Sequence, residues 1–542
     1  MAEVDPSQRI PLFEKIGYSL GDSAANFVFL TMVIFQQAFY TDVMGLAPSK
    51  AALAILVPRL WDAFFDPIIG TTADRTKTRW GRFRPWILWT SVPWCVVMVL
   101  AYFTPTGLSD AGMLTWAIVT NTLLMSLYSA NNMPYAALGG VMTADLSERN
   151  KLNAIRFGAV MVAQWIVQTF TLILRDKFAD HNPDKAHLAH GWVMTMSVYA
   201  AICFICFLIC FATSRERVKP VEEAAQSGGA DAHAKGGSDK TLAYATPKRK
   251  HSIGDDLAGL LKNSPWIIMF IVTFLHFTVI SFQGGAGYQY FTRYPDPSAT
   301  YDVMAKLHMT NPDIGLKDTP GGFLGLIGYI VPGAPAVAAF HGNSALYSAL
   351  FGIIGTISKL TQIIGIIFAP ALAARFGKKA VCITAFVLTA AVNFGFYALR
   401  PDQVWGMIFM TGLMGLVYGP SIPLLWAIFA DVVDFGEWKL GIRTTGIIFA
   451  TIGFGLKAGL ALGGAALSWV EAWFGYSNDK PVTATHIEMF RVSNTIASGC
   501  VFAVCAAVLC GLWLNKRTTQ QVADDLAARR KAAEAGATPA VA

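Results

Sequence analysis

Two aspartates lie four residues apart in an apolar stretch of the sequence, RLWDAFFDPIIG, at Asp62 and Asp66. In a helix this spacing places both side chains on one face, one turn apart. Two carboxylates this close in a medium of low dielectric cannot both stay ionised cheaply, so the pair is suited to carrying a proton. With further oxygen ligands it could instead hold Na⁺. The spacing therefore predicts a cation-coupling site, and the alternative is a structural charge pair that fixes this helix to a partner.

Two basic residues are candidates to complete this site. Arg59 stands three residues before Asp62, on the same side of the helix. Lys457 lies in the middle of GFGLKAGLALGG, where glycines and alanines let a neighbouring helix approach closely. We expect Lys457 to pair with the two aspartates across an interface between two halves of the chain. A lysine that snorkels to the membrane surface is the alternative.

A second group of polar residues in apolar surroundings is suited to binding a polyhydroxylated ligand. Aromatic faces suit a sugar ring, and amides donate to and accept from its hydroxyl groups. A guanidinium can hydrogen-bond two hydroxyls at once. The predicted substrate-binding residues are Asn26, Tyr128, Asn132 and Arg156. For Arg156 the alternative is a snorkelling residue near a helix end, while His276 is read as a core histidine and Lys359 receives no role.

The composition indicates which elements must position these residues. Of the 542 residues, 54% are hydrophobic and 14% are charged, whereas soluble domains carry roughly 25% charged residues. The mean hydropathy is +0.46, and the apolar runs are long enough to cross about 30 Å of hydrocarbon as helices. This excludes a soluble enzyme, a nucleic-acid module and a disordered scaffold. The net charge of +7 is therefore read as a topology signal.

We predict an all-α membrane protein with twelve transmembrane helices in two six-helix halves. The spans lie near residues 14–40, 46–72, 86–105, 112–140, 153–175, 192–213, 265–292, 343–371, 379–399, 404–430, 443–473 and 490–514. The halves are residues 1–213 and 264–514, joined by a flexible link at 214–263 that is rich in Gly, Ala and charge. We expect an outward-facing insert at about 293–342, whose apolar stretch is too rich in Gly and Pro for a thirteenth span, and a tail at 515–542 with a short helix.

Lysines and arginines gather in alternate loops. They cluster in the loop near 75–84, in the loop near 375–379, in the 214–263 link and in the tail. Because such residues stay on the cytoplasmic side, both termini and the link are predicted to be cytoplasmic in a cell or inner membrane.

Cytoplasmic turns in the two halves are weakly similar. GTTADRTKTRWGRFRPW after the second span corresponds to ALAARFGKK after the eighth, and ADLSERNKLNAIRFG corresponds to ADVVDFGEWKLGIRTTG. Such turns can anchor a hinge by charge pairing with helix ends. The residues predicted to form this conformational charge network are Arg59, Asp74, Arg75, Arg82, Arg375, Asp431 and Asp434.

Several motifs resemble those of one transporter family. They are GYSLGDSAANFVF, FYTDVMGL, RLWDAFFDPIIG with DRTKTRWGRFRPWIL, NNMPYAALGGVMTAD, ADVVDFGEWKLGIRTTG and GLKAGLALGG. With these motifs the chain resembles the glycoside–pentoside–hexuronide:cation symporters, the melibiose-permease branch of the major facilitator superfamily. The motifs cover both halves and leave the link and the insert unmatched. The resemblance implies a twelve-helix fold with inverted repeats and alternating access.

The resemblance also implies residue roles. Asp62 and Asp66 match the family's cation-site carboxylates. Ser129 matches a hydroxyl near that site, and Lys457 matches a charge-balancing lysine. The sugar-facing positions are Asn26, Tyr128, Asn132 and Arg156.

Three positions depart from the family pattern. Phe65 stands where sodium-using melibiose carriers have an Asn, which removes an oxygen ligand and favours H⁺ over Na⁺. Asn26 and Asn132 stand where those carriers have sugar-gripping acids. Galactoside specificity is therefore open, and the neutral amides suit another glycoside or an acidic sugar such as a hexuronide.

We expect a secondary active symporter that takes up a glycoside or related sugar, such as a hexuronide or oligosaccharide, with H⁺ moving inward. The alternatives are a Na⁺-coupled sugar symporter and a carrier of lysolipids or other amphiphiles on the same fold. The sequence has no HExxH motif and no ligand cluster, so a membrane enzyme, catalytic residues, a cofactor and a resident metal are not expected. The expected partners are the sugar and the lipid bilayer, not nucleic acid, and the protein is expected to work as a monomer.

Overall fold

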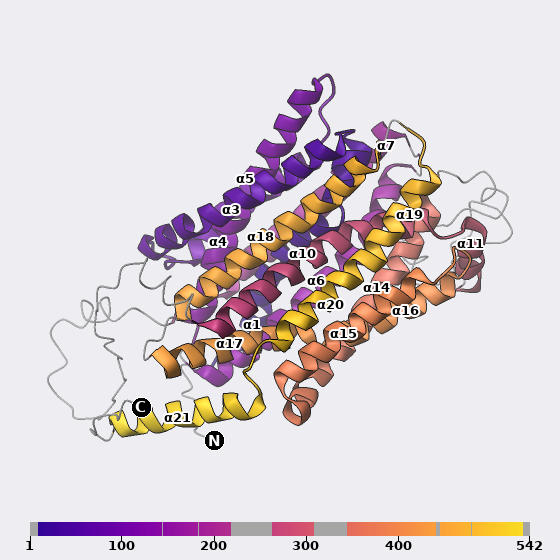
Figure 1. The fold of residues 1–542 in the computed structure, drawn as a ribbon. Helices are drawn as coiled ribbons and strands as arrows, with labels where there is room; N and C mark the ends of the chain where they lie inside the picture. The colour runs from indigo at the N-terminus through magenta and orange to yellow at the C-terminus, as the bar shows by residue number, and fades with distance from the viewer. Residues whose placement is uncertain are drawn as a thin grey trace.

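Long helices that run side by side make up most of the chain that the computed structural model describes (Figure 1). The described residues are 9–143, 145–180, 182, 184–217, 263–307, 344–440, 445–477 and 480–534. Within these ranges the chain forms helices and turns, and Thr78 and Gly81 form an isolated bridge. The all-α prediction is confirmed for the described residues.

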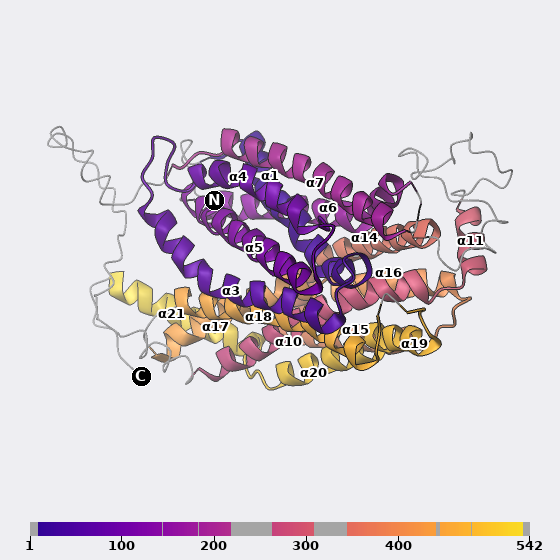
Figure 2. The same ribbon diagram turned by 90° about the horizontal axis from the view of Figure 1, so that it is seen from above.

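The helices up to residue 213 form the first half, coloured indigo to magenta in Figure 2. They are α1 (Leu12–Ile34), α2 (Gln36–Ala38), the π-helix η2 (Phe39–Val43), α3 (Pro48–Arg75), α4 (Arg84–Ala101), α5 (Asp110–Val141), α6 (Leu146–Phe178) and α7 (Lys185–Thr213). α1 packs against α6 and α7, and α3 packs against α5.

The helices from residue 264 onward form the second half, which lies beside the first in Figure 2. They are α10 (Ser264–Arg293), α11 (Pro297–Lys306), α14 (Ser344–Phe376), α15 (Lys378–Tyr397), α16 (Val404–Tyr418), α17 (Ser421–Leu440), α18 (Thr445–Trp473), α19 (Ala484–Val492), the π-helix η3 (Ser493–Ala497), α20 (Ser498–Cys510) and the tail helix α21 (Lys516–Glu534). The halves meet along two helix pairs, α3 with α18 and α6 with α14. The predicted domain bounds stay a prediction, because 218–262 lie outside the described residues.

The number of membrane spans follows from helix length and polarity. Ten helical stretches of the described residues are long and apolar enough to cross a membrane, and the bent pair of α1 with α2 and η2 gives an eleventh. α3 has 28 residues, but Arg59, Asp62 and Asp66 make it too polar to be counted by composition. It nevertheless packs against α5 and α18 within the bundle. With α3 included, the described residues contain the twelve spans that the sequence predicts.

Several helix ends differ from the predicted spans, because polar turns extend helices beyond their apolar residues. α6 begins at Leu146 rather than near 153, since the Asp145 side chain accepts a hydrogen bond from the Glu148 backbone N–H at 2.7 Å. The tenth predicted span does not end near 430. It breaks at Gly419 and Pro420 and continues as α17 to residue 440.

Two peripheral segments predicted from the sequence are described in part. The insert begins with α11, and residues 308–343, with the apolar stretch weighed as an extra span, lie outside the described residues. The tail forms α21, which packs against α17. The Trp438 indole donates a hydrogen bond to Asp525 at 3.0 Å, and Arg529 donates to the Trp438 carbonyl at 3.1 Å. The predicted helix in the tail is confirmed.

One end of the bundle, which we call the basic end, contains the start of α1, the α3–α4 turn, the end of α7 and the α14–α15 turn. We call the other end the opposite end. The ion pairs described at the basic end stay within one half or join it to the link: Lys15 with Glu148 at 2.7 Å, Arg217 of the link with Glu14 at 2.7 Å, and Lys378 with Asp431 at 2.6 Å. The hydrogen bonds from Arg217 to the Glu14 carboxylate raise the pKa of that guanidinium.

Small residues set the packing of α18 against α10. A Cβ atom on Gly463 would lie 2.1 Å from the carbonyl oxygen of Thr278, and one on Gly459 would lie 2.4 Å from that of Phe274. These positions therefore require glycine for the two helices to approach so closely. The contact fixes the rotation of α18 and leaves Lys457 facing α3 of the other half.

Candidate functional site

The ammonium group of Lys457 lies between the two aspartates predicted from the sequence. Its Nζ is 2.7 Å from Oδ2 of Asp62 and 2.5 Å from Oδ2 of Asp66. Ser129 donates a hydrogen bond to Oδ1 of Asp62 and lies 3.5 Å from Lys457 Nζ. α3, α5 and α18 thus bring together the four residues predicted to couple a cation, which we call the aspartate cluster. Their role in coupling stays a prediction.

The aspartate cluster lies deep in the bundle. Asp62 and Asp66 are near the middle of α3, Lys457 is near the middle of α18, and only 4% of Asp62 is exposed. Isolated carboxylates are costly in such surroundings, and the shared ammonium offsets part of that cost. Oδ1 of Asp66 is buried with no hydrogen-bond partner among the described residues. That oxygen has lone pairs available for a proton.

Arg59 extends the aspartate cluster into the second half. It donates a hydrogen bond to the Leu460 carbonyl oxygen and lies 3.4 Å from the Ser281 hydroxyl. The cluster then contains two acidic and two basic side chains, so its charges balance. Arg59 of the first half contacts the second, and Lys457 of the second contacts the first. Both bases therefore hold α3 against the second half.

A chain of polar contacts crosses the middle of the bundle. Nε of Arg156 lies 3.4 Å from Oδ2 of Asp22, and Asn26 donates to Oδ1 of Asp22 at 3.2 Å. Gln164 donates to Asn26 at 2.9 Å and accepts a hydrogen bond from Lys359 at 3.2 Å. This polar chain runs from α6 through α1 to α14 of the second half, so it lies between the halves.

The two remaining predicted substrate residues lie on α5. Asn132 donates to the Tyr128 hydroxyl at 3.4 Å, and the Tyr128 ring stacks on Trp94 with ring centroids 5.5 Å apart. Ser129 of the aspartate cluster follows Tyr128 directly. Adjacent residues of α5 therefore belong to the predicted cation site and the predicted substrate site.

Three residues that the sequence does not predict to bind substrate, Asp22, Gln164 and Lys359, belong to the same polar chain as Asn26 and Arg156. The sequence shows Asp22 and Lys359 as charges inside apolar spans, but it offers no partner for either. Gln164 carries no charge and gives no such signal. His276, by contrast, lies within the second half, where Nε2 is 3.1 Å from the Tyr418 hydroxyl.

A cavity of about 140 Å³ adjoins the polar chain toward the opposite end. Gln168, one turn beyond Gln164 on α6, and Ser358, which precedes Lys359, both line it. The remaining polar side chains of the lining come from Gln283, Tyr288, Asn393, Thr411 and Asn494. Amide and hydroxyl groups of this kind can bind the hydroxyl groups of a sugar.

Of the residues predicted to form a charge network, Arg59 lies beside the aspartate cluster, and the other six lie at the basic end. Asp74, Arg75 and Arg375 are exposed, and Asp431 pairs with Lys378 of its own half at 2.6 Å, one turn before Asp434 on α17. The Arg82 backbone N–H donates to Glu216 at 2.9 Å. In this conformation the described contacts therefore do not bring the turns of the two halves together at the basic end, and the network stays a prediction.

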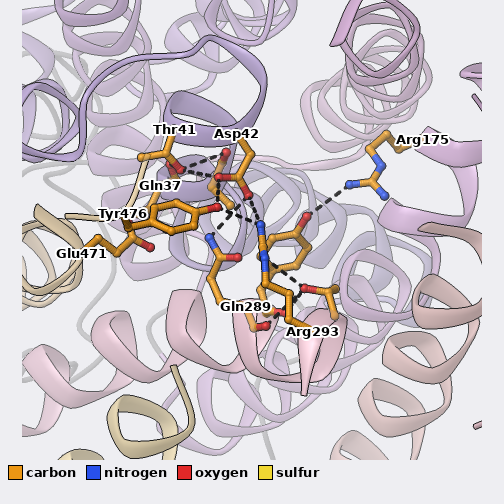
Figure 3. A network of polar contacts seen from close by, with 11 residues as sticks. Gln37, Thr41, Asp42, Arg175, Gln289, Arg293, Glu471 and Tyr476 are labelled. Atoms are coloured by element: carbon orange, nitrogen blue, oxygen red, sulfur yellow. Dashed lines mark hydrogen bonds and ion pairs between the residues drawn. The ribbon is translucent and has the colours of Figure 1, made fainter. Parts of the chain in front are cut away.

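A second buried network joins the halves at the opposite end (Figure 3). Asp42 of the first half accepts hydrogen bonds from Arg293 at 2.9 Å and from the Tyr476 hydroxyl at 2.8 Å. Gln37 donates to Glu471, whose side chain is 0% exposed. Burial and the Asp42 carboxylate raise the pKa of the Tyr476 phenol, so it remains a donor. We call this group the opposite-end network.

Arg175 and Asp176, at the end of α6, extend the opposite-end network (Figure 3 shows Arg175). They pair at 2.6 Å, and Asp176 accepts a hydrogen bond from Ser348 of α14 at 2.5 Å. Arg175 donates to the Tyr288 hydroxyl of α10 at 3.3 Å. The sequence does not reveal this network, because polar residues near the ends of spans are expected at any membrane boundary.

Comparison with known proteins assigns the family. A family model described as MFS/sugar transport protein matches residues 17–236 and 337–516. The chain belongs to this family. The protein is therefore a multi-pass membrane transporter of the sugar-transport family and not an enzyme.

Individual relatives agree with this assignment. The inner membrane symporter YicJ of Escherichia coli is 27% identical over 507 residues, which are 93% of this chain and 92% of the relative. The putative glycoside/cation symporter YagG of the same organism is 29% identical over 487 residues, 88% of this chain and 86% of the relative. The resemblance to glycoside:cation symporters stated from the motifs is thereby confirmed.

A solved structure shows the same fold. It is an inward-facing, unoccupied bacterial homologue of the human lysosomal transporter Spinster, with a TM-score of 0.59 at 12% identity over 96% of this chain and 99% of the other. At this identity the likeness concerns the fold alone.

Proposed function

We propose that this protein is a secondary active symporter that takes up a glycoside or related sugar together with a cation. The observation that carries the proposal is the position of Lys457, whose ammonium lies between two carboxylates of the other half. The carboxylates need a positive charge at that point, and an entering cation would supply it in place of the lysine. Release of Lys457 would then separate α18 from α3.

Coupling to the sugar follows from the same contacts. The sugar would bind along the polar chain of Asp22, Asn26 and Gln164, between the halves that must move. Ser129 and Tyr128 are neighbours on α5, so a change at one site reaches the other through one rigid helix. By linkage, cation and sugar then raise each other's affinity by the same factor.

The proposed coupling ion is H⁺. Phe65 lies between the two aspartates in the sequence, and its ring stacks on Trp61 with centroids 5.9 Å apart. It supplies no oxygen ligand, and hard metal cations take several. A proton needs one free carboxylate oxygen, such as Oδ1 of Asp66. Na⁺ coupling is the alternative that the experiment below separates.

We propose that the protein lies in the inner or plasma membrane of the cell. In the proposed orientation, the basic end and both termini face the cytoplasm. The contacts described between the halves lie at the middle of the bundle and at the opposite end. They support a conformation that is closed toward the outside, one of the two states that alternating access requires.

Uptake by proteoliposomes tests the proposal. The substrates are a panel of labelled neutral and acidic glycosides. An inward-directed proton gradient of one pH unit should accumulate the transported sugar about tenfold for each proton that moves with it, because one pH unit is worth about 1.4 kcal/mol. A Na⁺ gradient at equal pH should support none. Accumulation with Na⁺ alone would replace H⁺ as the coupling ion, and accumulation with neither would contradict symport.

The opposite-end network is expected to control access from outside. Arg293→Gln removes the guanidinium that contacts Asp42 and Tyr476, and losing charged hydrogen bonds of this kind costs about 1.5–3 kcal/mol. The reporter is a cysteine introduced at Gln283 in a variant without native cysteines. With Arg293→Gln, this cysteine should react with an impermeant thiol reagent added outside at least about fivefold faster than it does when Arg293 is retained.

Arg491→Gln is the matched control for this labelling experiment. Arg491 lies at the same end but pairs with Glu488 of its own half at 3.0 Å. Its loss should leave the labelling rate unchanged. Equal rates in the two variants would contradict a closing role for the opposite-end network.

A further inference from the structure

Lys359 is a cation in the middle of α14 whose described partners are neutral. Its Nζ lies 3.2 Å from Oε1 of Gln164 and 3.2 Å from Oε1 of Gln362. Arg156, also inside a span, has a carboxylate partner in Asp22. Two amide oxygens satisfy hydrogen bonds of an ammonium but do not neutralise its charge.

The charges at this depth do not balance. Away from both ends of the bundle, the described residues contribute three carboxylates and four cations: Asp22, Asp62 and Asp66 against Arg59, Arg156, Lys359 and Lys457. The excess positive charge falls on Lys359, because the other cations lie beside carboxylates. Entry of a coupling cation adds a second positive charge. A ligand that brings a negative charge would therefore be favoured at Lys359.

Space for such a ligand lies beside Lys359. The cavity of about 140 Å³ is lined by Ser358 and Gln168, which flank the contact between Lys359 and Gln164. Across the cavity, the Gln283 amide donates to Asn393 at 2.6 Å. The cavity thus offers amides for hydroxyl groups, and Lys359 directly follows Ser358, one of its lining residues.

We infer that Lys359, with Gln164 and Gln362, binds the carboxylate of an acidic sugar. The cargo class is then a hexuronide or a related sugar acid rather than a neutral glycoside. The inference rests on the proposed symport, and it assigns the charge of the substrate at that site. A coupling cation and a cargo anion that enter together also cancel each other's charge in the bundle.

Binding to the purified protein tests this inference. The probes are methyl glycosides and the matching methyl glycuronides, in gluco and galacto configuration, which differ by a carboxylate in place of a hydroxymethyl group. In at least one pair the wild type should bind the glycuronide more tightly. Lys359→Gln should weaken glycuronide binding at least about tenfold and change glycoside binding less than about twofold, whereas Lys359→Arg should retain most glycuronide binding.

A second variant supplies the missing charge from within the protein. Gln164→Glu places a carboxylate within reach of Lys359 and should abolish the preference for the glycuronide. Lys151→Gln is the matched control, since it removes a lysine that is 59% exposed and pairs with Glu148 at the basic end. Its binding should equal that of the wild type. Thermal unfolding of each variant verifies that it is folded.

The possible results separate the inference from the proposed function. Equal loss of both probes in Lys359→Gln, or a wild type that prefers the neutral member of each pair, would overturn the carboxylate site. Cation-driven uptake of a neutral glycoside would then still support symport. Absence of cation-driven uptake for every sugar would overturn the proposed function and the inference together.

Discussion

Asp62→Asn and Asp66→Asn are each expected to abolish accumulation of sugar against its gradient, while exchange of sugar across the membrane continues. Asparagine keeps the size of the side chain but binds no proton near neutral pH. An imposed pH gradient then has no route into the transport cycle, so the accumulation ratio falls from about tenfold per pH unit to about 1. Lys457 keeps one carboxylate partner in either variant, so the fold is retained.

Asp110→Asn is the control for these variants. Asp110 is exposed at the start of α5 and pairs with Lys50, far from the aspartate cluster. It should accumulate sugar like the wild type in the same proteoliposome assay. Accumulation by both cluster variants at the level of this control would contradict the coupling role of the pair.

Lys457→Ala is expected to cause the largest loss of stability. It leaves Asp62 and Asp66 as neighbouring carboxylates without the ammonium that both contact at 2.7 and 2.5 Å. Removing one partner of a buried ion pair costs about 3–5 kcal/mol. We expect a lower unfolding temperature in detergent and no accumulation of sugar.

A double variant separates charge from packing at this position. Lys457→Ala with Asp66→Asn leaves Asp62 beside Arg59, so the cluster is again balanced. It should recover most of the stability lost by Lys457→Ala, although it should not accumulate sugar. A double variant as unstable as the single one would show that Lys457 stabilises through packing alone.

The aspartate cluster could be predicted from the sequence because its rules are local. Asp62 and Asp66 share a helix face by their spacing, and a lysine such as Lys457 deep in an apolar span needs an acidic partner. Few charged residues lie at that depth, so Lys457 has few possible acidic partners. The helical fold is also predictable from local features, because the apolar runs have the length of a membrane crossing.

The polar chain was predictable only in part. Asn26 and Arg156 stand out as polar groups inside spans, but their contacts depend on how α1, α6 and α14 are rotated against each other. Gln164 illustrates this, because a single glutamine gives no signal until it faces Lys359 of the other half. Side-chain neighbours between halves are a property of the packing, which local periodicity does not encode.

The charges at the two ends of the bundle show a different limit. Asp74 and Arg375 are conspicuous in the sequence but exposed in this conformation, whereas Asp42 and Glu471 are inconspicuous in the sequence but make contacts in the opposite-end network. A transporter closes its ends in turn, so one conformation can show the contacts of one end only. Sequence patterns do not specify which end is closed.

The central claim is that the pair of Asp62 and Asp66 takes up a cation in step with the sugar. The most direct measurement records the pH outside weakly buffered proteoliposomes when sugar is added without any imposed gradient. We expect the medium to become more alkaline by about one proton per sugar for the wild type, and we expect no such signal in Asp62→Asn. Sugar entry with neither proton uptake nor, in a matched assay, Na⁺ uptake would contradict the central claim.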